Sequence, residues 1–293
     1  MKKFKLIIIT VLKYTLLLVV SLLIALVIRL FLCNFYTVPT DSMEPAILPG
    51  DFILANKWIY GARIFTGLKF DRNSDPPMIH VPGFRKIRRN DIVVFNFPYR
   101  YGWDTVRMNL ETIFVKRCIG LPGDSLSVVE GFYKVAGLPD TLGYIPEQER
   151  LIRNRTMLDS SIIRAFAFDR KFNWDVFNFG PFYIPAAGST ITLTPENFKL
   201  YSRQIVYETS AVVRCDNSLV YINDTIKYDY TFRANWYFMA GDRVTNSQDS
   251  RYIGLIPEAY IIGKASRVMT SKEKGTGKRR WNRTLKAIKS LNY

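Results

Sequence analysis

An almost unbroken apolar run from Leu6 to Cys33 constrains this chain more than any other feature of its sequence. Only Lys13, Arg29 and a few small polar residues interrupt the run. A segment of this length crosses a hydrocarbon layer of ~30 Å as a helix, because a helix satisfies its own backbone hydrogen bonds in lipid. We therefore expect residues 1–35 to form a short cytoplasmic start and a transmembrane anchor.

Basic residues at the start of the run indicate how the anchor is oriented. Lys2, Lys3, Lys5 and Lys13 keep the N-terminus in the cytoplasm by the positive-inside rule, which puts the rest of the chain outside. A cleaved signal peptide is the alternative, but no small-x-small cleavage site follows the run. The expectation is an uncleaved, single-pass anchor in the cytoplasmic (inner) membrane, with an extracytoplasmic domain after about residue 35.

The net charge of +16 suits a partner that is anionic, either a membrane surface or nucleic acid. The basic excess lies at the two ends of the chain, which favours the lipid bilayer and argues against nucleic acid. In the tail, residues 271–293, Trp281, Leu285, Ile288 and Leu291 fall close to one face of a helix. We expect a basic amphipathic helix on lipid there; a solvated, disordered tail is the alternative.

Past the anchor, short runs rich in Ile, Val and Phe alternate with turn residues, which is typical of β-strands. A helical period recurs only in Glu147–Arg164, apart from the anchor and the tail. The pattern predicts a mainly β protein with barrel-like antiparallel sheets on one N-terminal transmembrane helix. The expected strands are Asp51–Ala55, Asp91–Phe97, Thr112–Ile119, Ser125–Val129, Ala211–Arg214, Leu219–Ile222, Thr225–Tyr230, Trp236–Ala240 and Ala259–Val268.

A serine and a lysine stand out as candidates for hydrolytic chemistry. The chain has one histidine, His80, in a proline-flanked loop, so a Ser-His-Asp relay would depend on it. Ser42, in TDSMEPAILPGD, and Lys116, in FVKRCIGLPGD, offer another route. A neutral lysine amine can take a serine proton if burial lowers the lysine pKa toward the working pH.

The surroundings of both residues suit these roles. Pro39 and Pro45 keep the Ser42 segment out of regular helix, so its hydroxyl can be exposed while its N–H points at an oxyanion. Lys116 lies in the apolar strand Ile113–Ile119, where desolvation favours the neutral amine. The plainer alternatives are an ordinary turn serine and a strand lysine that reaches solvent.

A third string, AGDRVTNSQDSRYIGLIPEA (residues 240–259), is unusually polar between two strands. Asp249 and Arg251 are spaced for an ion pair, and Ser247 could hydrogen-bond to a buried amine. A solvated loop with a surface salt bridge is the alternative.

Metal or cofactor chemistry has no support in the sequence. No Cys/His cluster has metal-ligand spacing, and no Gly-rich phosphate loop follows a strand, so we expect neither a metal nor a cofactor. The three cysteines are too few for a disulfide framework. A Cys118–Cys215 bridge suits an oxidising compartment, and buried free thiols are the alternative.

Taken together and in this order after an N-terminal anchor, the three strings resemble the type I signal peptidase (leader peptidase) family. They match its serine box, its lysine box and its closing GD…NS.DSR box, and RRNDIVVFNFP (Arg88–Pro98) matches its β-strand box. The resemblance implies a catalytic β core at residues 36–125 and 232–270. Residues 126–231 then correspond to the family's variable β insertion, and residues 271–293 to the tail.

The resemblance also implies roles for individual residues and a function. Ser42 is the expected nucleophile, Lys116 its general base, and the Ser42 N–H with the Thr40 hydroxyl the oxyanion hole. The implied activity is a membrane-anchored serine endopeptidase that removes signal peptides from exported preproteins. The supporting residues would be Ser247, which orients the lysine amine, Asp249, Arg251, Gly241 and Asp242. Val38, Met43, Ile47, Phe114 and Val115 would line shallow pockets for small substrate residues.

The chain departs from the family pattern at two places near the nucleophile. The family's GDNR reads Gly241-Asp242-Arg243-Val244 here, and Asp41 replaces the small residue that precedes the nucleophile. A carboxylate at that position could disturb the oxyanion hole or retune the lysine.

Two other functions fit parts of the sequence. A Ser-Lys self-cleaving protease of the SOS-repressor type shares the catalytic logic, but the anchor argues against it. A non-catalytic, membrane-tethered β-domain that binds lipid or protein partners is the other alternative. It would place Ser42 and Lys116 too far apart to hydrogen-bond.

Overall fold

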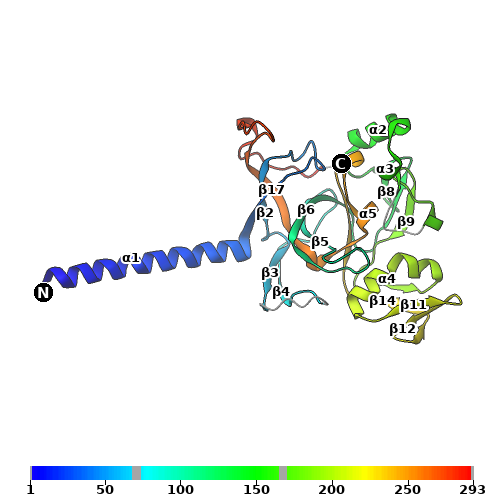
Figure 1. Ribbon diagram of the computed structural model, residues 1–293, viewed down its shortest axis with the longest axis horizontal. Helices are drawn as coiled ribbons and strands as arrows, with labels where there is room; N and C mark the ends of the chain where they lie inside the picture. The colour runs from blue at the N-terminus through cyan, green and yellow to red at the C-terminus, as the bar shows by residue number, and fades with distance from the viewer. Residues whose placement is uncertain (1, 68–73, 165–169, 292–293) are drawn as a thin grey trace.

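An N-terminal helix projects from a body made mostly of β-strands (Figure 1). The computed structural model describes residues 2–67, 74–164 and 170–291. Helix α1 (Lys2–Val27) continues into a π-helical turn (Ile28–Leu32), and strand β1 (Cys33–Thr37) follows directly. The most apolar 18 residues within Lys3–Leu32 have a mean hydropathy of 2.8, and none of them is buried in the protein. It is long and apolar enough to cross a membrane, as the sequence predicts.

The anchor joins the body through specific contacts rather than through a loose linker. The Lys57 N–H donates to the Leu32 carbonyl, and the Lys57 ammonium donates to the Arg29 carbonyl. These bonds cap the last turn of the helix, whose carbonyls have no partner within the helix itself. The start of β1 is therefore fixed relative to the end of the apolar segment.

The body is organised around one seven-stranded sheet with the order β1-β2-β17-β5-β6-β15-β16, in which every neighbouring pair is antiparallel. These strands correspond to short runs rich in Ile, Val and Phe that are flanked by Gly, Pro, Asn and Asp. The remaining members are β2 (Asp51–Asn56), β5 (Ile92–Phe97), β6 (Asn109–Gly120), β15 (Trp236–Ala240), β16 (Ile256–Pro257) and β17 (Ile261–Ser271).

Smaller antiparallel sheets surround the main one. A hairpin of β3 (Gly61–Phe65) and β4 (Met78–Pro82) carries His80, paired with Arg63. A three-stranded sheet has the order β8-β7-β9, and another the order β11-β12-β13. The other strand bounds are β7 (Ser125–Val129), β8 (Phe132–Val135), β9 (Phe179–Tyr183), β10 (Thr190–Thr192), β11 (Val213–Asp216), β12 (Leu219–Ile222), β13 (Thr225–Lys227) and β14 (Asp229–Thr231), with β10 paired to β14.

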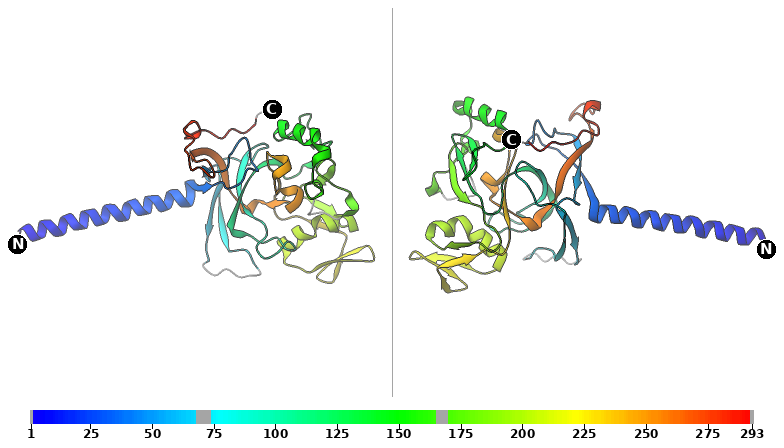
Figure 2. Two further views of the ribbon diagram at one scale, coloured as in Figure 1. Left: turned by 45° about the horizontal axis from the view of Figure 1, so that its top comes forward. Right: turned by 180° about the vertical axis from the view of Figure 1, so that it is seen from behind.

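Residues 126–231 lie on the side of the body away from α1 (Figures 1 and 2). They contain helices α2 (Ile145–Arg153), α3 (Ser160–Ile163) and α4 (Pro195–Thr209), and the short α5 (Ser250–Ile253) follows later in the chain. Side chains of this region, such as Phe182 and Tyr201, share one hydrophobic core with Phe95 and Phe238 of the main sheet. The insertion is therefore packed onto the sheet.

The predicted fold class, mainly β with antiparallel sheets and one N-terminal apolar helix, is confirmed; the described strands form open sheets and no closed barrel. Both ends of the main sheet, β1 and β16, pair on one side only. The expected helix at Glu147–Arg164 is broken into α2, a 3-10 turn (Arg155–Met157) and α3.

The tail is the clearest correction, since its described part contains no α-helix and only one 3-10 turn, Trp281–Arg283. The chain instead runs back along β17. The Ile288 N–H donates to the Ser266 carbonyl and the Val268 N–H donates to the Lys286 carbonyl. Ile288 is buried in the same apolar cluster as Ile53 and Val268. Pairing with β17 satisfies the tail backbone, so the helical spacing of its apolar residues has no structural effect.

Candidate active site

A groove of about 700 Å³ runs between the end of β1 and the first half of β6. Ser42 and Lys116 lie together in its lining. The side chains around them come from three separate stretches of chain. These are residues 36–43, residues 111–116 and two residues of the loop that follows β15, Asn246 and Gln248.

Lys116 Nζ lies 2.5 Å from Ser42 Oγ, well within hydrogen-bond distance. Both residues are buried, with exposed fractions of 7% for Ser42 and 5% for Lys116. The pKa of Lys116 is lowered from 10.5 to about 8, mainly by burial and to a smaller extent by the charge of Arg251. The carboxylates of Asp249, Asp242 and Asp41 oppose this shift. A neutral amine in contact with a hydroxyl can accept its proton, which is what activation of a serine requires.

The segment that carries Ser42 is held rigidly on both sides. The Val38 N–H donates to the Asp51 carbonyl, and the Gly50 N–H donates to the Val38 carbonyl. After the serine, Met43 and Ile47 point into the core and are 1% and 0% exposed. The segment is therefore fixed at the sheet edge, with the serine side chain directed toward β6.

Alternation along β6 explains how Lys116 and its neighbour serve different sites. Lys116, opposite Val93 of β5, reaches Ser42, whereas Arg117, opposite Ile92, reaches Asp242. The Arg117–Asp242 pair is bidentate, with both distances 2.6 Å, and each side chain is 1% exposed. The pair therefore fixes the loop after β15 against β6, the strand that carries Lys116.

Asp249 and Arg251 form the ion pair expected from the sequence, and it is fully buried rather than at the surface. The carboxylate also accepts the Gly241 N–H at 2.9 Å, and the guanidinium donates to the Val244 carbonyl at 3.0 Å. Although burial opposes the charge, Arg251 holds the pKa of Asp249 below its usual value. The pair fixes the shape of the loop and places a negative charge near Lys116.

Gly241 allows the loop to approach the nucleophile closely. A Cβ at this position would lie 2.1 Å from Ser247 Oγ and 2.6 Å from the Ser42 carbonyl oxygen. Ser247 is buried here, but it is not among the hydrogen-bond partners of Lys116 in the described part of the chain. Its role in orienting the lysine stays a prediction.

The remaining expected residues are placed as follows. Thr40 is exposed and lines the groove with Ser42, so its part in an oxyanion hole also stays a prediction. Val38, Met43, Phe114 and Val115 line the groove, and their contact with substrate side chains stays a prediction. Ile47 is not part of the groove lining, because its side chain is wholly buried in the core beneath the nucleophile.

The two departures from the family pattern meet at the rim of the groove. The guanidinium of Arg243 pairs with Asp41, and it lies 3.2 Å from Glu44. Asn246 donates to the other Asp41 oxygen at 2.9 Å. The backbone N–H of Arg243 also donates to the Ser42 carbonyl. Asp41 and Arg243 each stand out in the sequence as a departure from the family pattern. The sequence does not indicate that the charge of Arg243 compensates the charge of Asp41.

A second set of supporting contacts comes from the tail and was not expected. Arg283 forms a bidentate pair with Asp51, which is 0% exposed, and donates to the Ala46 carbonyl at 3.1 Å. Asp51 in turn accepts the Leu48 N–H. These hydrogen bonds from the tail fix the position of the turn that follows Ser42.

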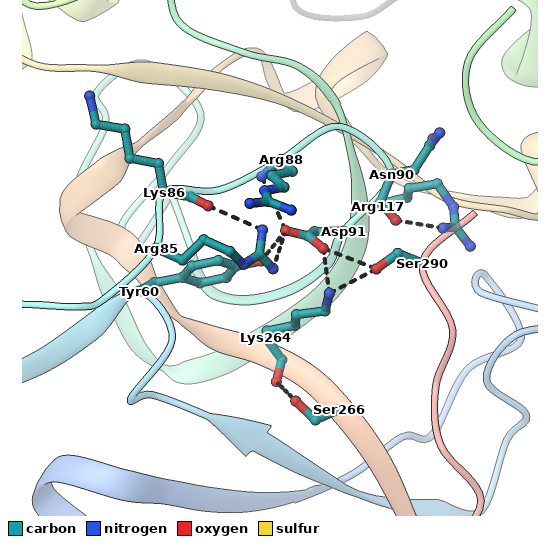
Figure 3. Close-up of polar contacts among 10 residues, drawn as sticks. All are labelled: Tyr60, Arg85, Lys86, Arg88, Asn90, Asp91, Arg117, Lys264, Ser266 and Ser290. Atoms are coloured by element: carbon teal, nitrogen blue, oxygen red, sulfur yellow. Dashed lines mark hydrogen bonds and ion pairs between the residues drawn. The ribbon is translucent and has the colours of Figure 1, made fainter. Parts of the chain in front are cut away.

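The end of the described tail is bound to a second buried carboxylate, Asp91 (Figure 3). The Asp91 oxygens form ion pairs with the Lys264 ammonium and the Arg85 guanidinium, and they accept hydrogen bonds from the Ser290 and Tyr60 hydroxyls. The neighbouring Asn90 carbonyl accepts from Arg117. The Asp91 cluster thus connects the tail to the strand that carries Lys116. An Asp at the start of a predicted apolar strand is the only sequence signal of such a site.

The described residues form neither a disulfide nor a metal-binding cluster. Cys33, Cys118 and Cys215 are free thiols, and Cys118 is enclosed in the apolar core. Within the described ranges, no group of three or more His, Cys, Asp or Glu side chains could hold a metal ion.

Comparisons with known proteins identify the family of this chain. The model of the family "Signal peptidase, peptidase S26" matches residues 11–270. The signal peptidase I of Buchnera aphidicola (subspecies Baizongia pistaciae) is 28% identical over 83% of this chain and 71% of its own length. That of Aquifex aeolicus is 27% identical over 83% and 78%, and that of Pseudomonas aeruginosa 27% identical over 85% and 69%.

A solved signal peptidase I from Enterococcus faecalis is 19% identical over 61% of this chain and 97% of its own, with a TM-score of 0.27. The family match extends from within the apolar helix to residue 270 in β17 and includes the strings that contain Ser42, Lys116 and Asp249. This chain belongs to the signal peptidase family, peptidase S26.

Proposed function

We propose that this protein is a membrane-anchored serine endopeptidase that cleaves signal peptides from exported preproteins with a Ser42–Lys116 dyad. One observation carries the proposal: the serine hydroxyl and a buried lysine amine are in contact within an open groove. This contact disfavours a non-catalytic tethered domain, which would have no need to bury a lysine against a serine. The N-terminal apolar helix disfavours the self-cleaving repressor alternative.

The reaction would proceed through an acyl-enzyme. Neutral Lys116 takes the Ser42 proton, and the alkoxide attacks the carbonyl carbon of the scissile bond. The Ser42 N–H and the Thr40 hydroxyl would stabilise the oxyanion. Lys116 then gives its proton to the leaving amine. The side-chain amine of Lys116, neutral again, activates the water that hydrolyses the ester.

The substrate would bind as an extended strand. β1 pairs with β2 only, and β15 pairs with β6 only at Arg117–Gly120. The free edges that remain on β1 and on residues 111–116 can hydrogen-bond the main chain of a peptide in the groove. Val38, Met43, Phe114 and Val115 would then contact alternate side chains of the substrate, which favours small ones.

The position of the site suits a substrate that is still held in the membrane. Ser42 follows Cys33 by nine residues (42 − 33 = 9), so it lies no more than ~30 Å from the end of the apolar run. We propose a cytoplasmic N-terminus and an extracytoplasmic catalytic domain, from the lysines that precede the helix. Protease added to spheroplasts should then digest the chain beyond residue 36, and protection of the whole chain would contradict this orientation.

Cleavage of a purified preprotein by the full-length protein in detergent or vesicles tests the activity. Ser42→Ala and Lys116→Ala should each reduce cleavage to near background, because nucleophile and base act as one unit. His80→Ala is the control and should stay within a few-fold of wild type, since His80 lies in the separate β3–β4 hairpin. Full activity of Lys116→Ala would disprove the dyad.

A further inference from the structure

A second cavity, of about 450 Å³, adjoins the catalytic groove. It shares Asn246 and Gln248 with the groove, so the two hollows meet at the loop after β15. No residue of β1 or β6 lines it. Its lining consists of Trp103, Ile162, Thr245, Asn246, Ser247, Gln248 and Tyr252.

The loop between the two hollows lies directly against the nucleophile. Arg243, just before the loop residues that line the cavity, donates its N–H to the Ser42 carbonyl at 3.1 Å. Ser247, which lines the cavity, fills the space next to Gly241 beside the same carbonyl. A substrate peptide that extends along the groove past Ser42 therefore reaches this cavity after it crosses the loop of residues 245–248.

The aromatic walls of the cavity are held in place. The Trp103 ring packs against Phe97 and Tyr99, with centroids 5.7 and 5.2 Å apart. The Tyr252 hydroxyl donates to the Ile162 carbonyl, which joins the two sides of the cavity. Fixed walls of this kind form a binding site without an entropic cost for ordering them.

The lining determines which side chains fit. It combines aromatic and aliphatic groups with neutral amides and hydroxyls, and it contains no Lys, Arg, Asp or Glu side chain from the described residues. A bulky apolar side chain gains by leaving water for such walls, whereas a charged one loses hydration without finding a partner.

We propose that this cavity is the subsite for the first two residues after the scissile bond, the N-terminal residues of the mature product. It prefers an aromatic or large apolar side chain at one of them and disfavours a charged one. The inference rests on the proposed endopeptidase activity and on the substrate crossing the 245–248 loop. The leaving amine would depart through this side of the site.

A set of peptides tests this subsite. Their residues before the cut are identical, and Ala, Phe, Lys or Asp occupies the first or second position after it. For the wild-type protein, kcat/KM should be several-fold higher with Phe than with Ala at one position, and several-fold lower with Lys or Asp. Equal values across the series would overturn the inference.

Two variants locate the preference in the cavity. Trp103→Ala should reduce the Phe-to-Ala ratio of kcat/KM toward one. Gln248→Glu, an exposed position that perturbs packing little, should raise the ratio of Lys to Asp peptides by roughly tenfold or more, because it adds a carboxylate to the lining. Ratios unchanged in both variants would overturn the assignment to this cavity.

Tyr101→Ala is the matched control, an exposed aromatic close to Trp103 in sequence but outside the lining. It should leave every ratio at the wild-type value. The test separates this inference from the proposed function, because peptides cleaved by wild type and not by Ser42→Ala establish the activity whatever the ratios are. Absence of any Ser42-dependent cleavage would instead refute the proposed function.

Discussion

The guanidinium of Arg243 pairs with the carboxylate of Asp41, the residue directly before the nucleophile. Both side chains are partly exposed, at 29% and 28%. Asp41 is also one of the carboxylates that raise the pKa of Lys116. The Arg243 charge therefore offsets part of the contribution by which Asp41 raises the Lys116 pKa.

Removal of Arg243 should shift the activity of the protein to higher pH. In Arg243→Gln, the charges of Asp41 and Glu44 lose their partner, so the Lys116 pKa should rise and the increase of kcat/KM with pH should occur at higher pH. In Asp41→Asn alone, the increase should occur at lower pH. In the double variant, it should occur close to the wild-type pH. The same pH dependence of kcat/KM in all four proteins would show that solvent screens this pair from the lysine.

The wild-type rate should follow the deprotonation of Lys116. Its pKa is lowered by burial to about 8, and the protonated ammonium cannot accept the serine proton. kcat/KM should accordingly rise as pH increases through about 8 and level off above it. Measurement from pH 6 to 10 with an uncharged peptide checks this, and a flat profile below pH 8 would mean that another group accepts the proton.

A methyl group at Gly241 should damage catalysis with little effect elsewhere. In Gly241→Ala the new Cβ would lie 2.6 Å from the Ser42 carbonyl oxygen, so either the loop or the nucleophile must move. A displacement of ~1 Å at a nucleophile costs on the order of 100-fold in rate. Gly123→Ala is the control, because its Cβ would meet no atom within 4 Å. It should lower stability through its positive φ and leave kcat unchanged.

Arg283 in the tail should be needed for stability and activity, whereas the exposed Lys278 should not. Arg283→Ala leaves the buried Asp51 carboxylate without its cation, a loss of roughly 3–5 kcal/mol when one partner of a buried pair is removed. The turn after Ser42 should loosen, with a lower kcat for a soluble peptide.

Lys278→Ala removes an equal charge from an exposed position of the same tail and is the control. Denaturant unfolding in detergent and peptide cleavage measure both effects. Equal behaviour of the two variants would support the view of the tail as a lipid-binding segment with no structural role.

Much of the core of the site could be predicted because its signals are local in sequence. Ser42 and Lys116 each lie in a short string whose neighbours fix a turn or a strand. Their contact could be expected only from the family resemblance, because β2, β17 and β5 lie between β1 and β6 in the main sheet. The partners of Arg117 and Arg283 could not be predicted this way, because they lie 125 and 232 residues distant in the chain. Such pairings depend on the strand order, which local patterns do not specify.

Two errors have distinct physical causes. The apolar spacing of the tail suggested a helix, but hydrogen bonds to β17 and the Arg283–Asp51 pair outweigh that weak local preference. Helix α4 is not among the helices predicted from the sequence, although its start has clear signals: Thr194 accepts the Asn197 N–H as an N-cap, and Pro195 occupies the first turn. The turn residues around it are equally typical of the ends of strands.

The place of β17 between β2 and β5 has a consequence for the timing of assembly. β17 (Ile261–Ser271) joins two strands from the first third of the chain, so the sheet around Ser42 and Lys116 cannot form until residue 271 has been synthesised. Pairing over such sequence separations is also slow. In the proposed orientation, Ser42 therefore leaves the cytoplasm before the sheet that brings it to Lys116 is complete. The proposed dyad would then assemble only on the outer side of the membrane.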